Sequence, residues 1–124
     1  MTKETKVFIG IVFGLVVTIT GLFIFNANTP GKYDEFAQCI NNSGATFFGT
    51  FWCPHCQQQK LLFGKSEKYL PYKECSTPNG HDFNLCANDN IESTPTWQFA
   101  DGTRVTGVQS LESLATVTNC KLPQ

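Results

Sequence analysis

The sequence predicts an α/β domain, with a mixed central sheet flanked by helices, preceded by an N-terminal transmembrane helix. Three observations support this prediction. Residues 7–25 are apolar and uncharged, residues 33–124 alternate between helical and strand patterns, and Asp101-Gly102 reads as a two-residue turn between the last two strands. A helix between two strands implies a parallel pair and a two-residue turn implies an antiparallel pair, so the sheet is expected to be mixed.

The N-terminal stretch Val7–Phe25 has nineteen residues and no charge. As a helix it would extend roughly 28 Å, about the thickness of the hydrocarbon core of a bilayer. Lys3 and Lys6 precede it, and no Lys or Arg follows before Lys32. The positive-inside rule then places residues 1–6 in the cytoplasm and the chain beyond the helix outside.

A cleaved signal peptide is the alternative to this single-pass anchor. Its apolar core would be shorter, and Asn26-Ala27-Asn28 is a poor small-residue cleavage site. We therefore expect an uncleaved anchor, a linker over residues 26–32 and one extracytoplasmic domain over residues 33–124.

Charge, length and cysteine content exclude some classes of protein and favour others. The chain has 124 residues, a net charge of −1 and no cluster of cations, which argues against a nucleic-acid partner. About 90 residues follow the apolar segment, enough for one domain and not two. Six cysteines in so small a domain indicate disulfides and an oxidising compartment, unless the cysteines bind a metal.

The expected helices follow from apolar residues at helical spacing, from Pro54 near a helix start and from Ser110 as a cap. They cover 33–42, 54–65, one or two turns in 83–88, and a last helix from Ser110 to about Asn119. The expected strands are short runs rich in aromatic or β-branched residues and bounded by turn residues. They cover 45–52, 69–75, 96–100 and 103–108.

The motif Cys53-Pro54-His55-Cys56 directly follows a predicted strand and opens a predicted helix. A helix start offers unpaired N–H groups and the positive end of the helix dipole, which can lower a cysteine pKa from about 8.5 to about 3.5–7.5. Cys53 is therefore the expected nucleophile. Cys56, one turn further on the same face, is the expected resolving thiol. His55 can add positive charge or a donor near the sulfur, which would make the disulfide more oxidising.

Two other readings of this pair stay open, because a CxxC motif alone is only moderately specific. The pair can be a structural disulfide. It can also be half of a zinc site, which needs about four ligands, with His55, His81, Cys75 and Cys86 as the remaining candidates. Trp52, which precedes the motif, can shield Cys53 or contact a substrate, or it can simply be packed aromatic surface.

The four other cysteines are expected to form disulfides. Cys75 and Cys86 would close a loop of turn residues and contribute roughly 3 kcal/mol. The alternative for this pair is a second exchanging disulfide. By elimination Cys39 pairs with Cys120, which would contribute roughly 4.5 kcal/mol. Six cysteines allow fifteen connectivities, so this assignment remains a hypothesis.

The segment 51–56, FWCPHC, and the later Thr94-Pro95-Thr96 together resemble the active site of the thioredoxin superfamily. A longer pattern, FWCPHCQQQK…FGKS…YLPYKEC…TPTW, resembles more closely the thioredoxin-like domain associated with bacterial vitamin K epoxide reductase homologues. This similarity covers roughly residues 36–120. This resemblance implies a cis proline at Pro95 beside the cysteines, with Thr94 presenting backbone groups to an extended substrate. It implies electron transfer through sulfur, without a cofactor or metal.

In such systems a membrane enzyme passes oxidising equivalents from quinone to the thioredoxin-like domain, which then oxidises exported proteins. This chain departs from the pattern in two ways. It has one apolar helix, so the quinone-reacting partner would be a separate protein. It also lacks the acidic residue often found in the strand before the motif. Glu74, on the neighbouring predicted strand, is then a candidate acceptor for the Cys56 proton, or else an exposed charge at a strand end.

The resulting expectation is a membrane-anchored extracytoplasmic thiol–disulfide oxidoreductase that donates disulfides to cysteine-containing exported proteins. Its expected partner is a membrane quinone-linked oxidoreductase of the vitamin K epoxide reductase type. The same site could run in reverse, reducing disulfides for cytochrome maturation or repair. A third possibility is a non-catalytic interaction module held together by structural disulfides.

Overall fold

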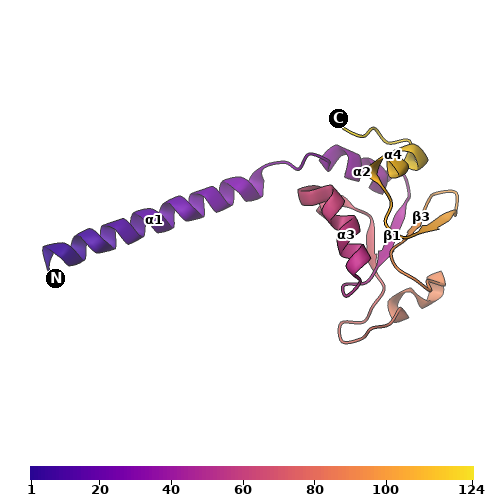
Figure 1. The fold of residues 1–124 in the computed structure, drawn as a ribbon, viewed down its shortest axis with the longest axis horizontal. Helices are drawn as coiled ribbons and strands as arrows, with labels where there is room; N and C mark the ends of the chain where they lie inside the picture. Colours follow the sequence, from indigo (N-terminus) through magenta and orange to yellow (C-terminus); the bar gives the residue numbers. More distant parts are fainter. The chain divides into compact units, whose positions relative to one another are not determined.

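The computed structural model describes all residues from 1 to 124, drawn in Figure 1. The chain divides into two compact units, Met1–Pro30 and Gly31–Gln124.

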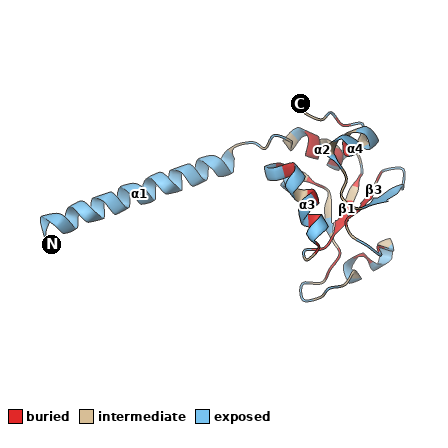
Figure 2. Ribbon diagram, viewed as in Figure 1, coloured by how far each residue is buried: buried red, intermediate tan, exposed pale blue.

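The first unit is a single helix, α1 (Lys3–Asn28), which is longer at both ends than the predicted span. Thr2 caps its start by accepting from the backbone N–H of Thr5. None of its residues is buried, as the uniform colour of α1 in Figure 2 shows. Thr18 and Thr20 donate their hydroxyls to backbone carbonyls of the same helix, so these polar groups are satisfied without other partners. The helix is long and apolar enough to cross a membrane, a property that signal sequences share.

The second unit contains three α-helices, two 3₁₀ helices and four strands. In chain order they are α2 (Asp34–Asn42), β1 (Thr46–Gly49), α3 (Pro54–Phe63), η1 (Gly64–Tyr69), β2 (Tyr72–Glu74), η2 (Asn84–Asp89), β3 (Thr96–Gln98), β4 (Arg104–Thr106) and α4 (Leu111–Thr118). The elements occur in the predicted order. The strands are shorter than predicted, because backbone pairing ends before the aromatic and β-branched runs do.

The four strands form one sheet in the order β2-β1-β3-β4. β1 pairs parallel to β2, and β3 pairs antiparallel to both β1 and β4. This confirms the predicted fold class, a mixed sheet with helices and a preceding apolar helix. In the register of the central strand, Phe47 stands opposite Tyr72 on one side and Trp97 on the other.

Consecutive residues of β1 point to opposite faces of the sheet and enter two different cores. Phe47 belongs to the larger core, where its ring stacks on Trp97 with centroids 4.8 Å apart. The three α-helices of this unit contribute to that core through Phe36, Phe63 and Leu114 respectively. Phe48 belongs to a smaller core, which also contains Cys75, Cys86, Ile91 and the partly buried Phe83.

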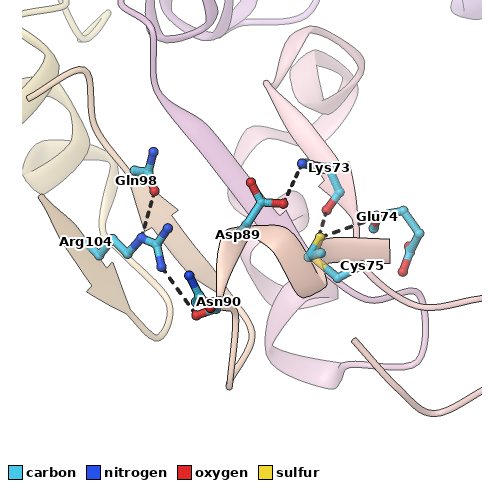
Figure 3. Close-up of polar contacts among 8 residues, drawn as sticks. Lys73, Glu74, Cys75, Asp89, Asn90, Gln98 and Arg104 are labelled. Carbon is cyan, nitrogen blue, oxygen red and sulfur yellow. Dashed lines mark hydrogen bonds and ion pairs between the residues drawn. A yellow bond between two sulfur atoms is a disulfide. The ribbon is translucent and has the colours of Figure 1, made fainter. Parts of the chain in front are cut away.

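The helix η2 covers the smaller core. Polar contacts attach this helix and the residue after it to the sheet (Figure 3). Lys73 on β2 forms an ion pair of 2.7 Å with Asp89. On the other side, Arg104 on β4 donates to the carbonyl of Asn90 at 3.4 Å and to Gln98 at 2.7 Å. The segment that covers Phe48 is therefore tied to strands at both sides of the sheet.

Two disulfides close the unit. Cys39 of α2 bonds to Cys120, which follows α4, and Cys75 after β2 bonds to Cys86 in η2. These are the two pairs named in the sequence analysis. The first bond links residues 81 apart and joins the two ends of the unit, whereas the second spans 11 residues and lies inside the smaller core.

Candidate active site

Cys53 and Cys56 are thiols at the junction between β1 and α3. Cys53 occupies the N-cap position of α3, and Pro54 takes the first helical position, where its missing N–H leaves no hydrogen bond unmade. The sulfur of Cys53 takes the role that a capping oxygen usually has, because it accepts a hydrogen bond of 3.3 Å from the backbone N–H of Cys56.

The environment of Cys53 favours the thiolate. Burial on its own would raise the pKa of this thiol. Hydrogen bonds from the Cys56 thiol, the Thr94 side chain and the backbone N–H groups of Cys56 and His55 outweigh that effect and lower the pKa. The thiolate, which this environment favours, is the nucleophilic form of a cysteine.

Cys56 has the opposite character. Its residue is fully buried, and burial together with the hydrogen bond to Cys53 raises the pKa of its thiol to about 11. Cys56 therefore keeps its proton at neutral pH. The two cysteines, three residues apart, have environments that push their pKa values apart, as a nucleophile and a resolving thiol require.

The segment around Pro95 lies beside the cysteines. The Thr94–Pro95 peptide bond is cis, and the thiol of Cys53 is 3.5 Å from the Thr94 carbonyl oxygen, to which it donates. The Thr94 and Thr50 hydroxyl oxygens also lie 3.5 Å apart. The structure thus brings the Thr94–Pro95 segment next to Cys53, although about forty residues separate them in the chain.

Trp52 is fixed by the loop that the Cys75–Cys86 bond closes. Its indole N–H donates to the Ser76 hydroxyl at 3.0 Å, and its ring lies 5.2 Å from that of His81 and 6.0 Å from that of Phe83, centroid to centroid. Ser76 is buried and donates in turn to carbonyls of its own loop. The loop therefore fixes the orientation of Trp52, the residue that precedes Cys53.

His55 is exposed, and its ring Nδ1 lies 3.5 Å from the amide oxygen of Gln58. Its contribution to Cys53 in this structure comes from its backbone N–H, not from its ring. Cys75 and Cys86 are both buried, and their sulfurs are bonded to each other. Neither sulfur presents a free thiolate to a metal or to a reaction partner.

Three residues with specific polar contacts were not predicted from the sequence, two of them near the site (Tyr72 and Ser76) and one in the core (Gln59). Tyr72 donates its hydroxyl to Glu74 at 2.7 Å, and both side chains come from β2. Gln59, buried in α3, accepts from the indole N–H of Trp97 at 3.2 Å and from the backbone N–H of Gln109 at 2.7 Å. Ser76 is the third. The alternation along β2 could have placed Tyr72 and Glu74 on one face, whereas Gln59 and Ser76 carry no local signal.

Comparison with known proteins identifies a related oxidoreductase. The chain is 38% identical over 94 residues to the thiol-disulfide oxidoreductase LTO1 of Arabidopsis thaliana. The match covers 71% of this chain and 24% of LTO1, so the chain spans about a quarter of that relative's length. No family model matches the chain. The similarity indicates a relationship to thiol–disulfide oxidoreductases and agrees with the chemistry of the cysteine pair.

Proposed function

We propose that the protein is a thiol–disulfide oxidoreductase in which Cys53 is the nucleophile and Cys56 the resolving thiol. The observation that carries the proposal is the difference between the two thiols. Cys53 caps a helix start with a lowered pKa, whereas Cys56, one turn away, is buried and protonated. The Thr94–Pro95 segment beside Cys53 and the similarity to LTO1 support the same reading.

The exchange proceeds in two steps. When the pair is oxidised, a substrate thiolate attacks Cys53, the bond between Cys53 and Cys56 breaks, and Cys56 leaves and takes up a proton. A second thiolate of the substrate then attacks the substrate sulfur that is bonded to Cys53. The mixed disulfide breaks, and Cys53 is released as a thiolate. The substrate loses two electrons and forms a disulfide, and the Cys53–Cys56 pair gains the two electrons.

The direction proposed is the donation of disulfides to exported proteins. A lowered pKa at Cys53 stabilises the reduced form of the pair, which makes the oxidised form a stronger oxidant. The Cys39–Cys120 and Cys75–Cys86 bonds suit an oxidising compartment. The apolar helix α1 would hold the domain at the outer surface of the membrane, with Lys3 and Lys6 on the cytoplasmic side.

The proposed oxidant of the reduced pair is a membrane quinone-linked enzyme of the vitamin K epoxide reductase type. The proposed partner rests on the resemblance to thioredoxin-like domains associated with vitamin K epoxide reductase homologues. Its test is reoxidation of the reduced full chain in membrane vesicles that contain such an enzyme and a quinone. Loss of reoxidation when the quinone is omitted is the expected result, and equal rates with and without the enzyme would contradict this partner.

The activity itself is tested with reduced, unfolded ribonuclease A as substrate and the oxidised full chain in detergent. We expect the chain to form disulfides in the substrate and a Cys53→Ser variant to form none. A Ser113→Ala variant, altered at an exposed position of α4, serves as the control and should retain full activity. No disulfide transfer by the unaltered chain would overturn the proposal, and reduction of disulfides alone would favour the reverse direction.

A further inference from the structure

Cys56 must lose a proton before its sulfur can attack a mixed disulfide at Cys53, yet it lies where water does not reach it. A positioned acid–base group is the usual solution to such a problem. We propose that Tyr72 accepts the proton of Cys56 while passing its own proton to Glu74. This inference rests on the proposed function and assigns to two residues of β2 a part in its resolving step.

Gly49, the last residue of β1, gives Tyr72 access to Cys56. A Cβ atom at Gly49 would lie 3.3 Å from the sulfur of Cys56, 3.2 Å from the hydroxyl oxygen of Tyr72 and 2.5 Å from its ring. The thiol and the hydroxyl therefore border the same point, the space that Gly49 leaves open by having no side chain. Any side chain at Gly49 would overlap the ring of Tyr72 and displace it.

Glu74 is held in the orientation that a proton acceptor for Tyr72 needs. One carboxylate oxygen accepts the Tyr72 hydroxyl at 2.7 Å. The other accepts the backbone N–H groups of Phe51 at 3.2 Å and Ser76 at 2.9 Å. Because these two donors hold the second oxygen, the first stays directed at Tyr72. Glu74 acts on Cys56 only through Tyr72 and is a positioning residue in this sense.

Lys60 lies over the ring of Tyr72. Its ammonium group lies 3.6 Å from the ring centroid, a cation–π contact that comes from α3 one turn beyond Cys56. Burial, followed by the hydrogen bond to Glu74, raises the pKa of Tyr72 far above its ordinary value. Tyr72 therefore does not ionise on its own, and it can pass a proton on only by receiving one at the same time.

The charged and titratable groups around Cys56 come from two elements. α3 supplies Cys53 at its N-cap and Lys60 over the tyrosine ring, and β2 supplies Tyr72 and Glu74. The exposed ring of His55 is turned towards Gln58. Glu74 is thus the carboxylate to which the Tyr72 hydroxyl beside Cys56 is hydrogen-bonded.

The resolving step moves the Cys56 proton through the two β2 residues and exchanges one disulfide bond for another. The Cys56 proton moves to the Tyr72 oxygen, and the Tyr72 proton moves to Glu74. The Cys56 thiolate attacks the Cys53 sulfur, the bond from Cys53 to the bound thiol breaks, and that thiol leaves as a thiolate. The cysteine pair is oxidised and the bound thiol partner is reduced. In the opposite direction the same groups return the proton to Cys56 as it leaves.

An aromatic disulfide reagent that releases coloured thionitrobenzoate separates the two steps. The full chain in detergent, with only the Cys53–Cys56 pair reduced, should release one equivalent as Cys53 attacks and a second as Cys56 resolves. For Tyr72→Phe and Glu74→Gln we expect an unchanged first phase and a second phase slower by about tenfold or more at pH 7. The difference should shrink towards pH 11, where Cys56 ionises without help.

Tyr69→Phe, a change in η1, and Glu92→Gln, a change at an exposed carboxylate, are the matched controls and should leave both phases unchanged. A second phase of normal rate and normal pH dependence in both test variants would overturn the proton path and leave the proposed function standing. Absence of a second release from the unaltered chain would overturn the proposed function itself. If Tyr72→Phe also loses its first phase, the site is disrupted in that variant and Glu74→Gln decides.

Discussion

The sulfur of Cys53 lies 3.3 Å from the backbone nitrogen of Cys56, and the N–H of Cys56 donates to it at the start of α3. The sulfur therefore caps the helix with an acceptor whose strength increases when it is ionised. Cys56, whose backbone makes this contact, turns its own thiol into the larger core. One turn of helix thus holds two thiols with different acidities.

The first prediction concerns the pH dependence of alkylation. Because the pKa of Cys53 is lowered and that of Cys56 is raised to about 11, the reduced chain should react with iodoacetamide at Cys53 first at pH 7. Labelling of Cys56 should increase as pH rises towards 11. Peptide mapping by mass spectrometry assigns the label. Labelling of Cys56 at the same rate as Cys53 at neutral pH would contradict the assigned roles.

The second prediction concerns trapping of the mixed disulfide. A reduced Cys56→Ser variant should accumulate a stable mixed disulfide with a disulfide-containing substrate protein, because Cys53 opens the substrate disulfide and no resolving thiol remains. A Cys53→Ser variant should accumulate none, because Cys56 is buried. Non-reducing gel electrophoresis after acid quenching measures both. Equal trapping by the two variants would show that Cys56 is as accessible as Cys53.

The third prediction concerns the hydrogen bond between Trp52 and the loop that the Cys75–Cys86 bond closes. Ser76→Ala removes the acceptor of the Trp52 indole N–H and a buried donor to two loop carbonyls. A buried group left without a partner costs about 1–3 kcal/mol, so unfolding in urea should require that much less free energy. The tryptophan emission should also change. Ser113→Ala, at an exposed position, is the control and should change neither quantity.

The fourth prediction compares the two structural disulfides. Replacing Cys39 and Cys120 by alanine opens a loop of 81 residues and should lower the free energy of unfolding by about 4.5 kcal/mol. Replacing Cys75 and Cys86 opens a loop of 11 residues and should cost about 3 kcal/mol through the same effect. Urea denaturation of both variants gives the comparison. A cost below about 1 kcal/mol for the 39–120 pair would contradict the loop-closure account.

Much of the fold could be predicted from the sequence, because each element carries a local signal. The helix cap at Ser110, the turn at Asp101 and the order of strands and helices all depend on neighbouring residues. Strand lengths were overestimated. The aromatic run after Gly49 reads as strand, but Phe51 gives its backbone N–H to the Glu74 side chain instead of to a neighbouring strand.

The cysteine pair and Pro95 could be predicted because the CxxC motif lies between a predicted strand and a predicted helix, and a Thr-Pro dipeptide follows it about forty residues later. Glu74 was recognised only as a candidate, and its partner Tyr72 was not recognised at all. Their importance depends on Gly49 of the neighbouring strand and on Lys60 of α3, which are brought together by tertiary packing. The same holds for Gln59, whose bonds reach Trp97 and the chain at Gln109. No sequence spacing encodes such contacts.

The equilibrium reduction potential of the Cys53–Cys56 pair tests the central claim most directly. It is measured on the full chain in detergent, with glutathione buffers and trapping of free thiols, and with Cys56→Ser as the control that cannot form the internal disulfide. The account predicts a potential above about −200 mV, because a stabilised Cys53 thiolate makes the disulfide oxidising. A potential near that of thioredoxin, about −270 mV, would contradict the proposed direction. A pair that does not exchange with glutathione at all would contradict the claim that Cys53 and Cys56 are redox-active.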